Sequence, residues 1–272
     1  MNAVFPPLTE LFPNSDYGFH LTLRRTEPRE FFRPYDASGE MLRERAGWLA
    51  AEPARYAMVT AEGVPLVAEF AGMAAEWGLI DASATAGGDD CATLLELGRK
   101  LEPDLAFLSA DESGAFRLRG GAVVFPTGWA LEEKVGHTLD FIHGVVPGLN
   151  PALGSPIQQF LTKLRPGTAF LRHNWGLATT DECNLHPARR IAPPTTPVQL
   201  EKLWLRVEHQ ALIALPKTRG IAFGIRIASH RLDRVAESSA RAGLKRALMT
   251  MPSEVAVYKQ LEAVRLIVIS LL

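Results

Sequence analysis

The spacing of apolar residues predicts helices toward both ends of the chain and strands between them. Residues 38–52 repeat apolar side chains at helical intervals, and Pro53 follows directly. Similar patterns predict further helices over residues 91–101, 155–164, 231–250 and 254–265. Residues 1–35 are rich in proline and aromatic residues and show little periodicity, so we expect an arm that wraps around the core.

A long helix is also predicted over residues 129–142. Apolar residues recur at spacings of four, four and three from Leu131 to Ile142, and Gly144 follows as an end signal. His143 would then lie at the C-terminal end of the apolar stripe of this helix. A histidine in this position is most often a core residue or a partner of the helix dipole.

The remaining apolar segments have the length and alternation of strands. They cover residues 56–60, 64–70, 104–125 (a pair of strands with a turn), 169–175, 203–211 and 221–228. Residues 67–80 are rich in alanine and could instead continue as a helix. Helices mixed with hairpins, without regular β-α-β alternation, favour the α+β class over a doubly wound parallel sheet.

Length and charge narrow the class of protein. The chain has 272 residues, of which 47% are hydrophobic, and its formal net charge is −1. A chain of this length holds one large or two small domains of about 150 residues each. Near-neutral charge argues against a dedicated partner of nucleic acid or of an anionic membrane.

Cysteine content and the ends of the chain point to the cytoplasm. Cys91 and Cys183 are too few for a disulfide framework, and residues 1–19 lack the pattern of a signal peptide. The longest apolar run, residues 266–272, is shorter than the ~20 residues that span a bilayer. We expect this run to dock on the core or to form an oligomer contact.

Common catalytic motifs are missing from the sequence. It has no glycine-rich phosphate loop, no HExxH, no GxSxG and no paired CxxC. Cys183 and His186 form a CxxH that could supply half a zinc site, but no second pair of ligands lies at a suitable spacing. A polar loop ending at Pro187 is the preferred interpretation.

One strand carries polar side chains at every second position. Residues 203–211 alternate strictly, with Leu205 and Val207 on one side and polar residues on the other. The polar row consists of Trp204, Arg206, Glu208 and Gln210, and the flanking strands add Arg172, Asn174 and Arg226. The simplest explanation is the solvated face of an antiparallel sheet.

Two details favour a partly buried pocket over a solvated face. Trp204 belongs to the row, and Arg226 interrupts a strongly apolar strand. A lone charge in such a strand is costly unless it is paired, and Glu208 is the nearest candidate partner by strand pairing. We therefore expect Glu208 and Arg226 to form a pair inside a lined pocket.

Four segments resemble, in order and spacing, the haem-dependent oxidative N-demethylase alpha-subunit family. They are Phe125–Gly148, Leu171–Trp175, Leu205–Gln210 and Ile221–Arg226. The resemblance covers roughly residues 120–228 well and residues 29–60 faintly. The sequence departs from the family pattern at His209, where an arginine is commoner, and this puts any role of that arginine in doubt.

The resemblance implies a PAS-like fold, an antiparallel sheet with flanking helices and helical extensions at both ends, which encloses one haem b. It implies a single haem-binding domain over residues 1–272. Within it, residues 1–55 form an N-terminal arm and helix, residues 56–228 form the PAS-like core, and residues 229–272 form C-terminal helices.

In haem-binding PAS domains the proximal histidine lies on the helix before the last strands, so the resemblance makes His143 the expected iron ligand. A helix-terminal imidazole can present Nε2 to iron and donate Nδ1–H to a nearby acceptor. His173 is the second choice, whereas His209 is expected to point away from Glu208. Arg172, Trp175 and Arg206 are assigned to cofactor binding as well.

The implied activity is oxidation of a small methylated amine, such as dimethylamine, by O2 to an amine and formaldehyde. A histidine-ligated haem lacks the thiolate of P450 enzymes, so distal groups would have to assist. We assign this role to Glu208, with Arg226 and Asn174 orienting it, and expect Trp175 or Tyr56 to attract the substrate cation.

Electrons would come from separate reductase subunits of flavin or ferredoxin type, because no motif for a flavin, nicotinamide or iron–sulfur centre is present. Two alternatives remain open at this point: a haem-PAS gas or redox sensor, and a scaffold that has lost its haem. The segment after Ala228 looks short for the output domain of a sensor.

Overall fold

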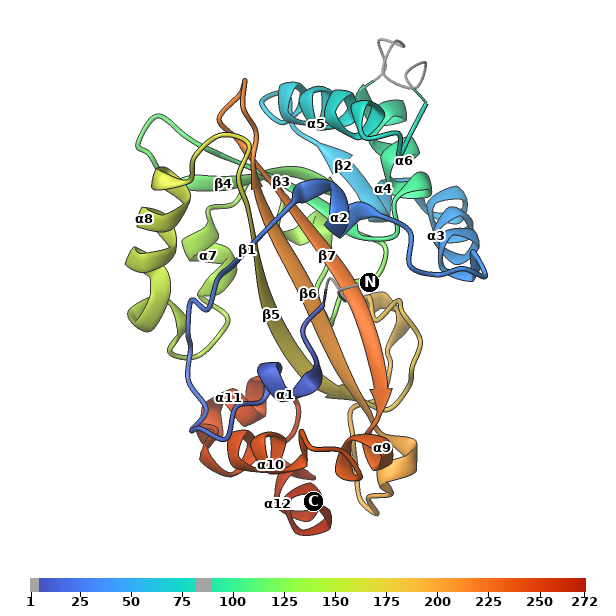
Figure 1. Ribbon diagram of the computed structural model, residues 1–272, viewed down its shortest axis with the longest axis vertical. Helices are drawn as coiled ribbons and strands as arrows, with labels where there is room; N and C mark the ends of the chain where they lie inside the picture. The colour runs from blue at the N-terminus through green and yellow to red at the C-terminus, as the bar shows by residue number, and fades with distance from the viewer. Residues whose placement is uncertain (1–4, 82–89) are drawn as a thin grey trace.

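A seven-stranded antiparallel sheet forms the centre of the computed structural model, which describes residues 5–81 and 90–272 (Figure 1). Its strands are β1 (Arg24–Thr26), β2 (Ala57–Val59), β3 (Asp104–Ala110), β4 (Phe116–Ala122), β5 (Ala169–Ala178), β6 (Trp204–Ala214) and β7 (Ile221–Arg231). They lie in the order β1-β5-β6-β7-β3-β4-β2, and all neighbours are antiparallel. The predicted α+β class is confirmed.

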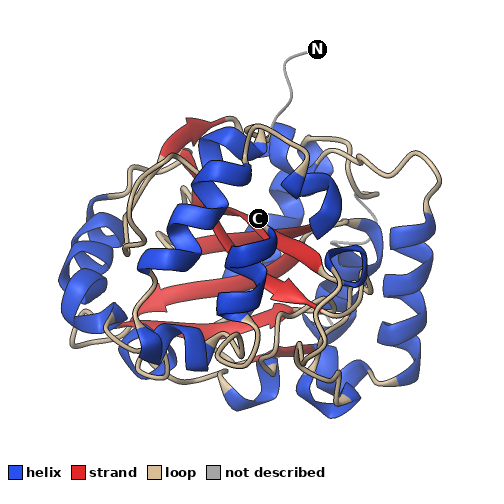
Figure 2. Ribbon diagram, turned by 90° about the horizontal axis from the view of Figure 1, so that it is seen from below, coloured by secondary structure: helices blue, strands red, loops and turns tan. Residues whose placement is uncertain are grey.

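Helices lie on both sides of this sheet (Figure 2). They are α1 (Leu8–Leu11), α2 (Pro28–Phe32), α3 (Glu40–Ala51), α4 (Pro53–Tyr56), α5 (Val64–Glu76), α6 (Asp90–Lys100), α7 (Leu139–His143), α8 (Ser155–Lys163), α9 (Leu232–Ala236), α10 (Arg241–Thr250), α11 (Ser253–Tyr258) and α12 (Arg265–Leu271). The helices predicted over residues 38–52, 91–101 and 155–164 are confirmed as α3, α6 and α8.

Two predictions at the ends of the core need correction. The second strand of the early pair, predicted over residues 64–70, is wrong, because this segment belongs to α5; the alternative of a helix over residues 67–80 is closer. The two closing helices predicted over residues 231–250 and 254–265 are divided into the three short helices α9, α10 and α11, and most of the apolar run at residues 266–272 forms a further helix, α12.

The single helix predicted over residues 129–142 is also wrong. Residues 131–133 form one turn of 3-10 helix, and α7 begins only at Leu139. Gly136 adopts a positive φ of 85°, and its N–H donates to the carbonyl of Leu118 in β4 at 2.7 Å. Pairing with the strand therefore replaces the helical hydrogen bonds of this segment, although His143 still ends α7 as expected.

The two faces of the sheet pack against different helices. Phe31 of α2 and Phe70 of α5 share a buried cluster with Leu105 of β3. Leu161 of α8 instead clusters with Leu212, whose side chain points to the opposite face. We call the face covered by α7 and α8 the α8 face, and the one covered by α2 the α2 face.

The C-terminal helices close the lower end of the sheet in Figure 1. Leu205 and Val207 of β6 pack with Leu244, Val255 and Val268 from α10, α11 and α12. These helices therefore lie near the ends of β5 and β6 at which the polar row begins.

Candidate functional site

The polar row predicted from the sequence lies on the α8 face of β5 and β6. Arg172 pairs with Gln210 and Asn174 pairs with Glu208 in the strand register, so all four side chains share one face. Leu212 continues this face toward α8. Glu208 and Gln210 are only 6% and 7% exposed, which excludes a simple solvated face.

Two amides hold one oxygen of the Glu208 carboxylate. Oε2 accepts hydrogen bonds from Asn174 Nδ2 at 3.2 Å and from Gln210 Nε2 at 2.7 Å. Asn174 therefore contacts Glu208, as its expected role of orienting this carboxylate requires. Oε1 has no hydrogen-bond partner among the described residues, so this oxygen is available to a ligand.

The expected pair of Glu208 and Arg226 is wrong. Arg226 lies opposite His209 in the register, and its side chain points to the α2 face. Its Nη1 pairs with Glu102, and its Nη2 donates to the carbonyl of Phe31 at 3.0 Å. Arg226 thus ties α2 to the sheet instead of orienting Glu208.

Arg206 shares a face with Glu208, but its donors are already used. Nε donates to Thr127 Oγ1 at 2.9 Å, and Nη2 donates to the carbonyls of Phe125 and Cys183 at 2.9 and 2.6 Å. The side chain is 1% exposed. Arg206 therefore holds two loops against the sheet, one at residues 125–127 and one at Cys183.

Trp175 does not join the polar row. It pairs with Val207 in the register and so points to the α2 face. Its ring packs edge-on against Phe12, with 5.2 Å between the ring centroids. Tyr56, the other residue expected to attract a cation, is buried and its hydroxyl accepts a hydrogen bond from Asn184 at 2.9 Å.

His143 lines a cavity of about 1020 Å³ between α7, α8 and the turn from β3 to β4. The pKa of His143 is lowered to about 4, mainly by burial and to a smaller extent by the charge of Arg172. The charge of Asp140 opposes this shift. The imidazole is therefore neutral at pH 7. No hydrogen bond to either ring nitrogen is found within the described residues, so both can serve a ligand.

Arg172 interacts electrostatically with both His143 and Glu208. Its charge acts on the pKa of His143, and the Glu208 carboxylate in turn acts on the pKa of Arg172. Burial lowers the pKa of this guanidinium, and Glu208 partly offsets the effect. The side chain is half-buried and forms no hydrogen bond or ion pair with the described residues, so it can receive an anionic group.

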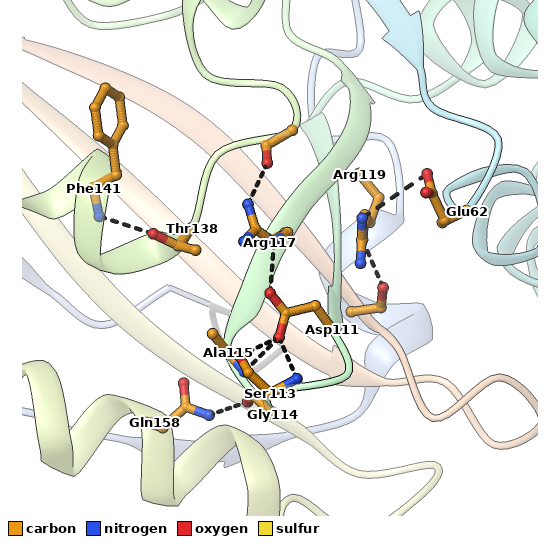
Figure 3. A network of polar contacts seen from close by, with 12 residues as sticks. Glu62, Asp111, Ser113, Gly114, Ala115, Arg117, Arg119, Thr138, Phe141 and Gln158 are labelled. Carbon is orange, nitrogen blue, oxygen red and sulfur yellow. Dashed lines mark hydrogen bonds and ion pairs between the residues drawn. The ribbon is translucent and has the colours of Figure 1, made fainter.

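Polar contacts hold α7 against β4 and so fix the place of His143 (Figure 3). Thr138 caps α7 by accepting from the backbone N–H of Phe141 at 3.2 Å. Arg117 of β4 donates to the carbonyl of Gly136, just before this cap, at 3.0 Å and to Asp111 at 2.6 Å.

Lys259, just after α11, is a site residue that the sequence analysis missed. Its Nζ donates to the carbonyl of Trp175 at 2.6 Å and lies 3.5 Å from Asn174 Oδ1. Burial lowers the pKa of Lys259 to about 8, and Glu208 opposes the shift. No local pattern in residues 254–265 distinguishes this lysine from a solvated one.

His173 and His209 form a pair on the α2 face. Their Nδ1 atoms lie 3.0 Å apart, and His209 points away from Glu208 as expected. Burial lowers the pKa of His173 to about 4 and that of His209 to about 3. His173, the second choice as iron ligand, therefore lies on the face opposite to the polar row.

These low pKa values predict an acid-sensitive protein. Between about pH 6.5 and pH 4 the unfolded chain binds more protons than the folded one, so the free energy of unfolding falls as the pH falls through this window. We expect the melting temperature to drop from pH 7 to pH 5, and to drop less in a His173→Phe, His209→Phe double variant. An equal drop in both proteins would contradict the assignment to these imidazoles.

The CxxH segment meets no second pair of metal ligands within the part of the chain that the structure describes. His186 Nδ1 accepts from the N–H of Ala188 at 3.2 Å, its Nε2 lies 3.3 Å from Glu132 Oε2, and burial raises the pKa of Cys183 to about 11. Within residues 5–81 and 90–272, no group of three or more His, Cys, Asp or Glu side chains could hold a metal ion. The polar loop remains the better interpretation.

Among the described residues, no helix combines the length and apolar character needed to cross a membrane.

A comparison with known protein families gives a match. Residues 37–269 match the model of a protein family described as haem-dependent oxidative N-demethylase, alpha subunit-like.

Proposed function

Because the chain belongs to the haem-dependent oxidative N-demethylase, alpha subunit-like family, we propose that it binds haem b and oxidises a small methylated amine of the dimethylamine type. The observation that carries the proposal is the position of His143. Its neutral imidazole lines a large cavity and has no hydrogen-bond partner among the described residues, and Arg172 links it electrostatically to Glu208.

The residues at this site fit a haem. The cavity of about 1020 Å³ lies at the upper end of the ~300–1,000 Å³ typical of ligand and cofactor pockets. Asn150 also lines it, and Asn150 Oδ1 is buried without a partner among the described residues, so it can accept a hydrogen bond from a water molecule held beside the cofactor. His143 would ligate the iron, and Arg172 would pair with a propionate.

The proposed cofactor site is smaller than the sequence suggested. Trp175 and Arg206 are not part of it, since one points to the α2 face and the other is fully bonded to loops. The PAS-like character of the fold and a single domain over residues 1–272 remain proposals. They are supported by one sheet that includes strands from residue 24 to residue 231, and by α7 preceding the last three strands.

The bound haem would supply the redox chemistry that activates O2 with two electrons. One oxygen atom enters a methyl C–H bond to give an N-hydroxymethyl amine, and the other leaves as water with two protons. The N-hydroxymethyl amine then breaks down to formaldehyde and the demethylated amine. We propose that separate reductase subunits of flavin or ferredoxin type supply the electrons, in the cytoplasm.

Glu208 carries the chain's own contribution in this proposal. Its free Oε1 would accept a hydrogen bond from the substrate nitrogen and hold the cation by charge. Asn174 and Gln210 fix the carboxylate by donating to Oε2, so that Oε1 keeps one direction. Arg226 is no longer part of this machinery, because it points to the other face.

Replacing His143 tests the cofactor proposal directly. We expect the purified protein, supplied with haem, to show a Soret absorption band that His143→Ala loses or shifts strongly. His137→Ala is the matched control, because that imidazole stacks on Phe141 with 4.1 Å between the ring centroids and does not line the cavity. A band unchanged in His143→Ala would contradict the assignment.

Turnover separates an oxygenase from a haem sensor. The haem-loaded protein, given a chemical reductant, O2 and dimethylamine, should release formaldehyde. Haem binding without formaldehyde release, even with reductase supplied, would contradict the proposed reaction while leaving the cofactor site intact.

A further inference from the structure

The polar row leaves two oxygen acceptors without donors at neighbouring positions. Glu208 Oε1 has no partner among the described residues, and it is not among the buried atoms that lack one, so solvent reaches it. Gln210 Oε1 is buried and also has no partner within the part of the chain that the structure describes. A buried acceptor without a donor costs free energy that a ligand with a suitable N–H can recover.

The hydrogen bond between the two side chains fixes which atom of Gln210 is free. Its Nε2 donates to Glu208 Oε2 at 2.7 Å, and reversing the amide would bring two oxygen atoms together. Gln210 therefore presents a carbonyl oxygen next to the carboxylate. Asn174 differs, because its own oxygen already lies 3.5 Å from Lys259 Nζ.

One neutral and one charged acceptor match a cation with two N–H groups. A secondary ammonium ion has two such groups, one for each oxygen, whereas a tertiary ammonium ion has one. Binding of a tertiary ion would leave one of the two oxygens unsatisfied. A site built to accept a hydrogen bond rejects analogues that lack the donor.

We propose that Gln210 is a specificity-determining residue, and that it makes the site selective for secondary over tertiary methylammonium ions. This inference rests on the proposed function for the presence of an amine. In this proposal Gln210 Oε1 is a second acceptor beside Glu208, and it recognises the second N–H group of the amine.

Equilibrium binding to the haem-loaded protein tests the inference without turnover. Dimethylammonium chloride and trimethylammonium chloride are titrated separately by calorimetry, and the ratio of their dissociation constants is the readout. We expect the unmodified protein to favour dimethylammonium by at least about tenfold. Gln210→Met keeps the size of the side chain, removes both the Oε1 acceptor and the Nε2 donor to Glu208, and should bring the ratio close to one.

Two variants serve as controls. Asn174→Leu also removes a donor to Glu208 Oε2 but leaves Gln210 in place, so both ions should bind more weakly and the ratio should stay. Gln210→Glu keeps an oxygen acceptor and should retain the preference even if Gln210→Met folds poorly.

Three results would overturn the inference: a preference retained in Gln210→Met, equal binding of both ions to the unmodified protein, or binding of neither. Each differs from a failure of the proposed function, which would show as a missing Soret band or missing formaldehyde.

Discussion

Glu208→Gln should leave the haem bound and slow formaldehyde release by at least about a hundredfold. The amide has nearly the same shape as the carboxylate, so the packing of the buried side chains around Glu208 on β6 is kept. It has no negative charge to hold an ammonium ion and cannot take up a proton from it. The loss therefore falls on turnover and on amine binding, while the cavity beside His143 is unaffected.

The measurement compares formaldehyde release and the Soret band in the same preparation. Glu208→Asp is the matched variant, because it keeps the charge and withdraws it by one methylene group; we expect it to retain part of the activity. Full activity in Glu208→Gln would remove this residue from the mechanism. Loss of the haem in the same variant would instead assign Glu208 to cofactor binding.

Glu102→Ala should lower the free energy of unfolding by about 3–5 kcal/mol, because it leaves the Arg226 guanidinium buried without its partner. Both side chains are almost fully buried, at 1% and 5% exposure. Glu102 also accepts from the backbone N–H groups of Tyr35 and Asp36 at 2.9 Å, so its loss releases the segment after α2 as well.

Chemical denaturation measures this loss, and Arg226→Met completes the test. If the pair is structural, the double variant should lose much less free energy of unfolding than the sum of the losses in the two single variants. The reason is that Arg226→Met removes the buried charge that Glu102→Ala leaves without a partner. Retained stability in Arg226→Met together with lost amine oxidation would contradict the structural role. Glu201→Gln, in an exposed turn, provides the baseline.

Local pattern was enough to locate most of the strands and the polar row, although it missed β1 and placed a strand at residues 64–70, which belong to α5. The alternation of residues 203–211 placed Glu208 and Gln210 on one side of β6, and the register confirms it. Alternation is a property of consecutive residues, so a sequence can show it without knowledge of the fold. His143 at the end of its helix was recognised in the same way.

Features that depend on neighbouring segments were not predictable from the pattern. The partner of Arg226 depends on the register between β6 and β7, and a shift of one residue reverses the face. Gly136 hydrogen-bonds to β4 instead of continuing a helix, because the carbonyl of Leu118 accepts from its N–H. Lys259 reaches the site only because the C-terminal helices fold back onto β5.

The short β1 has a consequence for solubility. It pairs only with residues 169–171, so no strand of residues 5–81 or 90–272 lies beside the outer edge of β5 beyond Leu171. An open edge of this kind can add a strand from another molecule and start aggregation. Lys259 occupies the carbonyl of Trp175 on this edge and places a charge there. Lys259, which borders the candidate site, thus also disfavours pairing of this edge with a strand of another molecule.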